Sequence, residues 1–480
     1  MMLRLFRMGM LHNVKWVAFS QITKISCQLL GMVLFSRYLS AKEFGIMSMA
    51  LVVVNFVNIL RDLGSSAAII QRDSVSDELK NSVFYLNLIF GFVLLALFMV
   101  LAPFISMFFK EPDLTFIIIL LSICFPVNSS TAIHLSLLER ESKFNLTAKV
   151  EIISSSLALI TAALLVVNGG GIYSIVSQTI AYSLFSAIGF WLVSGWTPKF
   201  IFSFVEVKSI LRFSSNLIGF NVINYFSRNS DQIIIGKFFN ATLLGYYSLA
   251  YRIMLFPIQN ITFVLTRSLY PILSRLQNDK KSSFGIYLNT LKSISIIIPP
   301  MMFGLAVISK DFITVVFGEQ WAPVSSILIW LAPTAILQSL ISTTGSVFMS
   351  QGKTDLLLKI SIYNAVLQIS SFLIGGFFSL SIMVKLYLVA NLLMFFPNMY
   401  LAISLLKGSF SALIIIFFKN LILATIMASF VHSLSLIPFF SEVSIFCSLL
   451  VKIISGVVLY LFLLFLFERD FILSKINLRE

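Results

Sequence analysis

Long apolar segments recur from one end of this chain to the other, and they limit the folds that it can adopt. A helix needs about 20 mostly apolar residues to cross a bilayer. The segments are continuous rather than alternating over about 10 residues, which indicates membrane helices and not a membrane β-barrel. The chain offers fourteen predicted spans: 13–36, 43–63, 80–108, 113–137, 144–167, 171–194, 208–236, 241–266, 283–308, 322–348, 354–377, 379–405, 410–435 and 441–467.

The composition agrees with a protein whose main surroundings are the lipid bilayer. Hydrophobic residues make up 58% of the chain and charged residues 11%, whereas soluble domains carry about a quarter charged residues. The loops between the spans are short, so they leave little room for a catalytic domain outside the membrane. We therefore predict an all-α polytopic membrane protein.

Lys and Arg residues are divided unevenly between alternate loops. If the N-terminus lies in the cytoplasm, 23 of the 34 Lys and Arg residues fall on the cytoplasmic side and 6 on the opposite side. The positive-inside rule then predicts that both termini are cytoplasmic. The net charge of +14 is accounted for by this orientation, and we do not interpret it as a surface for nucleic acid.

Two stretches that lie 200 residues apart resemble each other. FSRYLSAKEFGIMSMA at Phe35–Ala50 aligns with IGKFFNATLLGYYSLA at Ile235–Ala250. Because six predicted helices separate the two copies, both would have the same orientation, as in transporters built from parallel repeats. We expect two six-helix lobes, at 1–200 and 201–408, followed by two further helices and a cytoplasmic tail at 409–480.

Several charges lie inside the apolar spans, where they are costly and usually face a protein interior or a water-filled cavity. Polar residues repeat around them at spacings of three and four, which places each set on one helical face. Asp231 is the single carboxylate that we expect well inside this region, so positive charge is in excess. We predict a cationic cavity between the lobes that binds an anionic head group. Its binding residues are Lys24, Arg61, Arg228, Arg252 and Lys292, and its polar lining is Gln21, Gln28, Asn221 and Asn224.

These residues also have structural interpretations. Arg228 can pair with Asp231 one helical turn later, and Lys292 can extend its amine toward the membrane surface. Arg61 stands at a helix end, where it complements the helix dipole. Asp231 has a functional alternative as a proton or sodium site, with oxygen ligands added by Asn364 and Gln368.

Signatures of enzyme catalysis are missing from the sequence. The three histidines are far apart, and there is no Walker A loop, GxSxG or HExxH motif. We therefore expect no metal centre and no cofactor apart from a coupling proton or sodium ion. The energy for transport would come from an ion gradient or from the flux of the substrate.

Three motifs together identify a family resemblance. They are RYLSAKEFGIMSMA at Arg37–Ala50, RDLGSSAAIIQR at Arg61–Arg72, and NYFSRNSDQIIIGKFFNATLLGYYSLAYR at Asn224–Arg252. The chain resembles the Wzx-type polysaccharide flippases of the MOP exporter superfamily, in the branch of colanic-acid exporters. The resemblance implies a fold of fourteen helices. By position, it implies that Lys24, Arg228, Arg252 and Arg61 hold the pyrophosphate and acidic sugars of the substrate.

The resemblance also implies a substrate and a location. The substrate would be an undecaprenyl-pyrophosphate-linked oligosaccharide repeat unit, moved from the inner to the outer leaflet of the bacterial cytoplasmic (inner) membrane. The product would serve O-antigen, capsule or exopolysaccharide synthesis. A polysaccharide polymerase and chain-length machinery would then be partners.

Two alternative functions stay open at this point. A cation-coupled drug antiporter of the MATE type would belong to the same superfamily, but cationic drugs call for an acidic or aromatic cavity and the excess charge here is basic. A membrane polysaccharide polymerase would need a large outside loop with clustered Arg or acidic residues. The short loops of this chain argue against it.

Overall fold

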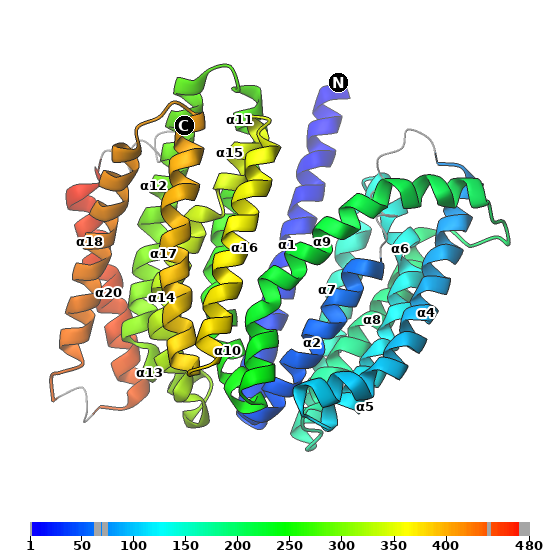
Figure 1. The fold of residues 1–480 in the computed structure, drawn as a ribbon, viewed down its shortest axis with the longest axis horizontal. Coiled ribbons are helices and arrows are strands. Elements are labelled where there is room, and N and C mark those ends of the chain that lie inside the picture. The colour runs from blue at the N-terminus through cyan, green and yellow to red at the C-terminus, as the bar shows by residue number, and fades with distance from the viewer. Residues whose placement is uncertain (1, 62–68, 70–74, 439–442, 470–480) are drawn as a thin grey trace. The chain divides into compact units, whose positions relative to one another are not determined.

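The computed structural model describes the backbone of residues 2–61, 69, 75–438 and 443–469. Side chains are described over the same ranges except at 2–14, 60–61, 206–207, 209–221, 223–224, 263–264 and 267. Within the described backbone, every element of regular structure is a helix (Figure 1). The all-α fold class expected from the apolar segments is therefore confirmed.

Contacts divide the chain into two compact units. The first unit is Met1–Gly245 and the second is Tyr246–Glu480. The first unit contains α1 (Met2–Tyr38), α2 (Ala41–Arg61), α4 (Asp77–Phe109), α5 (Asp113–Ser122), α6 (Cys124–Arg140), α7 (Phe144–Val167), α8 (Tyr173–Ser194), α9 (Phe204–Phe238) and the first turn of α10 (Ala241–Pro257).

The second unit contains the remaining helices. They are the rest of α10, the π-helical turn η1 (Ile258–Thr262), α11 (Phe263–Arg275), α12 (Lys280–Val307), α13 (Ser309–Val316), the 3₁₀ turn η2 (Glu319–Trp321), α14 (Pro323–Ile341), α15 (Thr344–Ser350), α16 (Thr354–Gly376), α17 (Leu380–Leu405), α18 (Phe410–Leu434) and α20 (Ile445–Phe467).

Twelve helical stretches among the described residues are long and apolar enough to cross a membrane. They correspond to twelve of the fourteen predicted spans. The other two predictions, 208–236 and 241–266, fall on α9 and on the run from α10 through η1 to α11. These two segments are helical, and their crossing of the membrane stays a prediction.

The segment 241–266 differs from the single α-helix that we expected. Its α-helical part ends at Pro257, five residues of π-helix follow, and α11 begins at Phe263. Proline lacks the N–H that would continue the hydrogen-bond ladder and its ring crowds the preceding turn. The change of helical pitch after Pro257 is consistent with this disruption.

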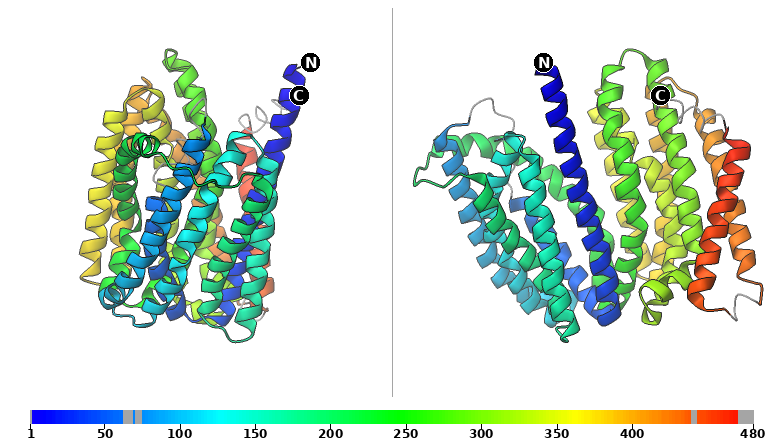
Figure 2. Two further views of the ribbon diagram at one scale, coloured as in Figure 1. Left: turned by 90° about the vertical axis from the view of Figure 1, so that its right-hand side faces the viewer. Right: turned by 180° about the vertical axis from the view of Figure 1, so that it is seen from behind.

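In the first unit, α7 packs against both α1 and α8, and α4 packs against α5 and α6 (Figure 2). The helix α9 packs against α2 and α4. A cluster of Leu138, Val150 and Phe190 joins α6, α7 and α8. The first unit is thus a helical bundle in which α7 lies between α1 and α8, and this arrangement positions the polar groups described below.

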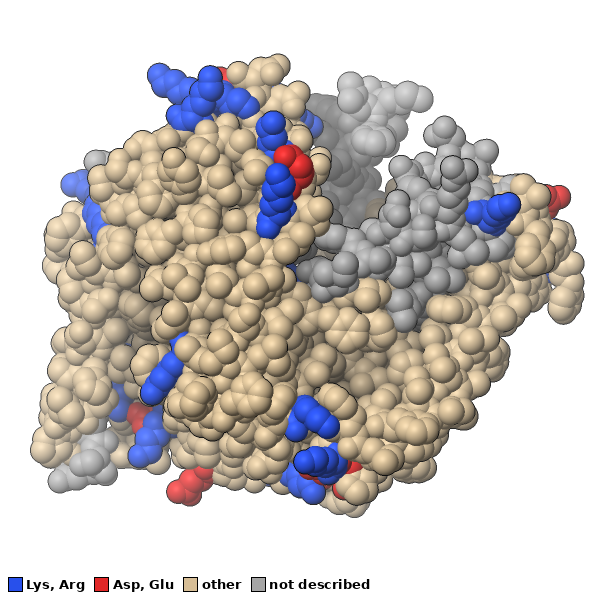
Figure 3. All heavy atoms as spheres, in the orientation of Figure 1, with Lys and Arg blue, Asp and Glu red and all other residues tan. Residues whose placement is uncertain are grey.

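In the second unit, α12 packs against α14 and α18, α17 packs against α14 and α16, and α18 packs against α20. On the face shown in Figure 3, the charged residues of this unit lie mainly near the two ends of its helices, with a largely uncharged band between them. Such a band is expected where helices meet the hydrocarbon interior of a bilayer.

The internal repeat reappears in the positions of helix ends. The helix α1 ends at Tyr38 and α2 begins at Ala41, whereas α9 ends at Phe238 and α10 begins at Ala241. Each new helix starts after a capping residue. The Ser40 hydroxyl accepts from the Glu43 N–H at 3.3 Å, and the Asn240 side chain accepts from the Leu243 N–H at 2.8 Å. Both residues satisfy donors that a helix N-terminus leaves free.

Candidate functional site

Lys24 of α1 is ion-paired with Glu151 of α7. The amine lies 2.9 Å from Glu151 Oε2, and the side chains are 32% and 25% exposed. The same carboxylate oxygen accepts a hydrogen bond of 2.6 Å from the Ser20 hydroxyl, one turn earlier on α1. Gln21 and Gln28 of α1 are exposed. The pair exists because α1 lies along α7.

Glu151 corrects our expectation that Asp231 is the one carboxylate well inside this region. It lies about 10 Å along α7 from Phe144, at 1.5 Å per residue, within a candidate span that begins at that residue. The sequence signal was present, since Glu151 interrupts a predicted apolar span. Its pairing with Lys24 could not be predicted without knowing that the two helices are neighbours. Because Glu151 is paired with Lys24, the positive charge in excess is smaller than we predicted.

Arg228 of α9 is exposed. None of the side chains that the structure describes forms an ion pair with it. The helix that carries it is anchored at Tyr225, whose buried hydroxyl donates to the Val52 carbonyl of α2. The ring of Tyr225 also contacts that of Phe56, with centroids 5.8 Å apart. These contacts hold one face of α9 against α2 while Arg228 lies on an exposed position.

Asp231, three residues after Arg228, is completely buried. Its Oδ1 accepts a hydrogen bond of 2.7 Å from the backbone N–H of Gln232. The proposed cation ligands from the second unit have other bonds. Asn364 of α16 exchanges two amide hydrogen bonds with Asn398 of α17, at 3.2 and 2.9 Å. A joint cation site of Asp231, Asn364 and Gln368 stays a prediction.

Two glutamine side chains form hydrogen bonds with Tyr387 of α17. Gln338 of α14 and Gln368 of α16 both donate to its hydroxyl, the latter over 3.4 Å. Its ring packs against that of Phe372, with centroids 4.7 Å apart. A polar network therefore links three helices inside the second unit. The sequence offers Gln368 as a candidate, but it gives no sign that a tyrosine is its partner.

Arg252 of α10 is exposed and lies next to a stacked pair of tyrosines in its own helix. The rings of Tyr247 and Tyr251 are 5.6 Å apart and nearly parallel. Among the described side chains, no carboxylate forms an ion pair with Arg252. Among the predicted binding residues whose side chains are described, Arg228 and Arg252 are therefore the ones with a guanidinium that no carboxylate pairs with.

Lys292 of α12 forms an ion pair of 2.5 Å with Glu468, which follows the last residue of α20. The second oxygen of Glu468 lies 2.8 Å from Lys419 of α18. One carboxylate at the C-terminal end of α20 thus joins that helix to α12 and α18. In the same unit, Lys452 of α20 lies 2.6 Å from Asp311 of α13. The bond to Glu468 accounts for the position of Lys292 without a substrate.

Three predicted site residues lie outside the described side chains: Arg61, Asn221 and Asn224. The motif that begins at Arg61 is also outside the description over most of its length, at 62–68 and 70–74. Their assignment to the substrate site stays as the sequence predicts it.

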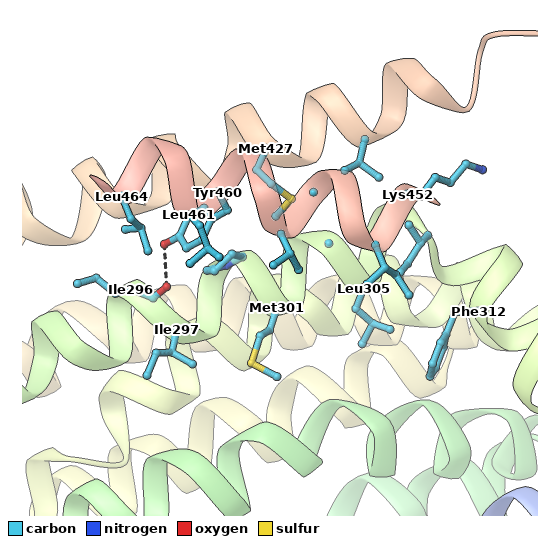
Figure 4. A pocket seen from close by; sticks show the side chains of 17 residues that line it. Ile296, Ile297, Met301, Leu305, Phe312, Met427, Lys452, Tyr460, Leu461 and Leu464 are labelled. Carbon is cyan, nitrogen blue, oxygen red and sulfur yellow. Dashed lines mark hydrogen bonds between the residues drawn. The ribbon is translucent and has the colours of Figure 1, made fainter. Parts of the chain in front are cut away.

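An apolar groove of about 500 Å³ lies between α12, α18 and α20 of the second unit (Figure 4). Its lining includes Met301, Leu305, Met427, Leu461 and Leu464. Lys452 is at one end of the lining, with its amine bound to Asp311. The groove can accept hydrocarbon, but its lining offers no available cation for a phosphate group.

One hydrogen bond crosses this groove. The Tyr460 hydroxyl of α20 donates to the Ile296 carbonyl of α12 over 2.7 Å (Figure 4). In an α-helix this carbonyl would accept from the N–H of residue 300. That residue is proline, as is residue 299, and neither has an N–H. Tyr460 therefore supplies the donor that α12 lacks.

Comparison with known proteins places these features in a family. A family model described as "Polysaccharide biosynthesis protein" matches residues 34–326. The teichuronic acid biosynthesis protein TuaB of Bacillus subtilis (strain 168) is 29% identical over 72% of this chain and 72% of its own length. The lipopolysaccharide biosynthesis protein WzxC of Escherichia coli (strain K12) is 27% identical over 76% of this chain and 75% of its own length.

The fold has a counterpart among solved structures. The lipid II flippase MurJ, in an inward closed conformation, matches with a TM-score of 0.74 and 19% identity, over 96% of this chain and 100% of that chain. At this identity the likeness shows the fold alone. The family model covers more than half of the residues, so this chain belongs to the Wzx-type family of polysaccharide biosynthesis proteins, and its fold is like that of MurJ.

Proposed function

We propose that this protein is a flippase for undecaprenyl-pyrophosphate-linked oligosaccharide repeat units. It moves them from the inner to the outer leaflet of the bacterial cytoplasmic membrane, where a polymerase assembles O-antigen, capsule or exopolysaccharide. In this proposal α9 and the segment from α10 to α11 complete fourteen spans, grouped as two six-helix lobes with α18 and α20 added. Both termini are cytoplasmic.

The observation that carries the proposal is the state of Arg228 and Arg252. Both lie in helices of mainly apolar sequence, both are exposed, and no described carboxylate neutralises either one. A guanidinium presents several N–H groups in a fixed plane, which matches two oxygens of a phosphate. A pyrophosphate head group would supply the missing negative charge. A cationic drug would gain nothing from these residues, which disfavours an antiporter of the MATE type.

The test is complementation of a bacterial strain whose own flippase gene has been deleted. Surface polysaccharide is measured by immunoblot, and lipid-linked repeat units that remain on the cytoplasmic side are measured by mass spectrometry. We expect the wild-type chain to restore export when the host makes a repeat unit that the protein accepts. Arg228→Ala and Arg252→Ala should each reduce export about tenfold or more, because a hydrogen bond to a charged group contributes about 1.5–3 kcal/mol.

Arg275→Ala is the matched control, since Arg275 is an exposed arginine in the last turn of α11. It should export normally. All variants must be present in the membrane in equal amounts, as judged by a fluorescent fusion. Normal export by Arg228→Ala and Arg252→Ala would remove both residues from the mechanism. A wild-type chain that changes drug resistance but exports no polysaccharide would contradict the proposed function.

A further inference from the structure

The Lys24–Glu151 ion pair is placed so that another anion could take the Lys24 amine from Glu151. One oxygen, Oε2, receives both the Ser20 hydroxyl and the Lys24 amine, at 2.6 and 2.9 Å. Both donors come from α1, and no bond to Oε1 is found among the described residues. Each side chain of the pair keeps a quarter or more of its surface exposed. The pair is therefore embedded in the bundle but is still accessible from outside it.

The surroundings of Glu151 contain few other charges. The neighbouring helix α8 contributes Tyr182, which is close enough to interact electrostatically with the carboxylate. The helix α6 meets α7 through the apolar side chain of Leu138, and its buried His134 is bonded to Ser194 of α8. On α7 itself, the amine of Lys149 lies over the Trp16 ring, 5.4 Å from its centre. Lys24 is thus the cation that neutralises Glu151.

A carboxylate in such a position depends strongly on its partner. Removing one member of a partly buried ion pair leaves an uncompensated charge on the other, and this is costly to the extent that water is kept away from it. A carboxylate can avoid that cost by taking up a proton. Whatever withdraws Lys24 from Glu151 will therefore favour protonation of Glu151.

We propose that Glu151 is the proton-coupling residue of the transport cycle. When an anionic head group binds, its phosphate oxygens take the Lys24 amine. The released Glu151 carboxylate then takes up one proton from the buffered solvent and forms one O–H bond, so the change in charge at the pair is balanced. When the head group leaves, the proton is lost and the ion pair re-forms. This inference rests on the proposed function, and it assigns coupling to a residue other than Asp231.

Isothermal titration calorimetry can measure how many protons the protein takes up when a pyrophosphate binds. Farnesyl pyrophosphate is titrated into the purified full-length protein in detergent, in buffers of different ionisation enthalpy between pH 6 and pH 8. The variants are Glu151→Gln, which resembles the protonated acid, and Glu141→Gln as the matched control. Glu141 is a half-exposed carboxylate paired with Lys143 at a helix end. The quantity of interest is the difference in proton uptake from the wild type, because pyrophosphate also binds protons.

We expect the wild type and Glu141→Gln to take up about one proton more per bound pyrophosphate than Glu151→Gln does. Each fall of one pH unit should also raise the affinity of the wild type and of Glu141→Gln for farnesyl pyrophosphate. This rise should be up to tenfold larger than the rise for Glu151→Gln. Equal proton uptake by the wild type and Glu151→Gln would overturn the role of Glu151 and leave the proposed function intact. An absence of binding to the wild type would instead overturn the pyrophosphate site, and the coupling role with it.

A second variant, Lys24→Gln, tests the same proposal if Glu151→Gln does not fold. In Lys24→Gln, a bound head group has no Lys24 amine to withdraw from Glu151, so the additional proton uptake should again disappear. Binding should weaken about tenfold or more, because a charged contact to phosphate is lost. If Lys24→Gln still takes up the additional proton, the exchange mechanism is wrong.

Discussion

Gly45 and Gly245 each face the backbone of the other's helix. A Cβ atom at Gly45 would lie 1.7 Å from the carbonyl oxygen of Ala241, and one at Gly245 would lie 1.8 Å from that of Ala41. Each glycine is four residues after the alanine at the start of its own helix. The two helix starts therefore cross in a reciprocal small-residue contact, the kind that lets membrane helices approach closely.

The glycine contact predicts a strong effect of a single methyl group. Gly45→Ala or Gly245→Ala would force two backbones apart, which should destabilise the protein by about 3 kcal/mol or more, at the upper end of the cost of overpacking. We expect a marked loss of monodisperse protein in detergent and a lower melting temperature. Gly285→Ala is the control, since a Cβ at Gly285 would meet nothing within 4 Å. It lies inside α12, where alanine favours the helix by about 1 kcal/mol. A wild-type melting temperature for Gly45→Ala would disprove the close contact.

The geometry of the guanidinium groups gives a second prediction. Arg228→Lys and Arg252→Lys keep the positive charge but lose the planar group that contacts two oxygens at once. In the complementation assay, each should export more polysaccharide than the alanine variant and less than the wild type. Initial export rates should be measured at matched protein levels. Lysine variants with full activity would show that charge alone is needed.

The shared carboxylate of Glu468 should give a pH-dependent stability. Burial opposes its ionisation, but the hydrogen bonds and charges of Lys292 and Lys419 together outweigh burial and lower the pKa of Glu468 below its ordinary 4.5. The unfolded chain therefore binds this proton more readily than the folded one. The contribution to stability is complete above pH 4.5 and is lost as the pH falls through the lower pKa of the folded state.

Glu468→Gln tests this prediction. It should cost about 1–3 kcal/mol near pH 7, less than the 3–5 kcal/mol of a fully buried pair, because the Lys419 side chain is 40% exposed and water screens it. The difference in melting temperature between wild type and variant should shrink below pH 4.5. Glu141→Gln should show little effect at any pH. A difference that is constant from pH 7 to pH 4 would contradict the assigned pKa.

The bond from Tyr460 to Ile296 should depend on the prolines of α12. Tyr460→Phe leaves a partly buried carbonyl without a donor, which costs about 1–3 kcal/mol. In a Pro300→Ala background the new N–H can donate to Ile296, so the same tyrosine change should cost less. A double-mutant cycle measures this coupling as a difference in unfolding free energy. Tyr270→Phe, at an exposed tyrosine of α11, should be neutral in both backgrounds. Strictly additive effects would disprove the compensation.

The features that could be predicted from the sequence are those that depend on neighbours along the chain. Apolar segments of sufficient length predicted fourteen spans, and twelve of these correspond to candidate spans among the described residues. The repeat around Ala41 and Ala241 agrees with helix ends that lie 200 residues apart. Pro257 was visible as a helix-disturbing residue, but the five π-helical residues after it depend on packing that a linear pattern does not describe.

The features that escaped prediction depend on which helices are neighbours in space. Lys24 was singled out as a charge inside a predicted span, yet its partner Glu151 is on a helix more than a hundred residues away. The same is true of Lys292 and Glu468. A charge count along the chain could not pair these residues, and it therefore overestimated the free positive charge. The substrate roles of Arg228 and Arg252 stay predictions until the variants above are measured.

The donor that Tyr460 supplies also restricts the order in which related chains could change. If Pro300 is replaced first, the Ile296 carbonyl regains a donor within its own helix. Tyr460 can then be substituted with little loss of stability. If Tyr460 is replaced first, the chain must pass through a less stable intermediate. Lineages that have lost the tyrosine are therefore expected to have lost the proline before it.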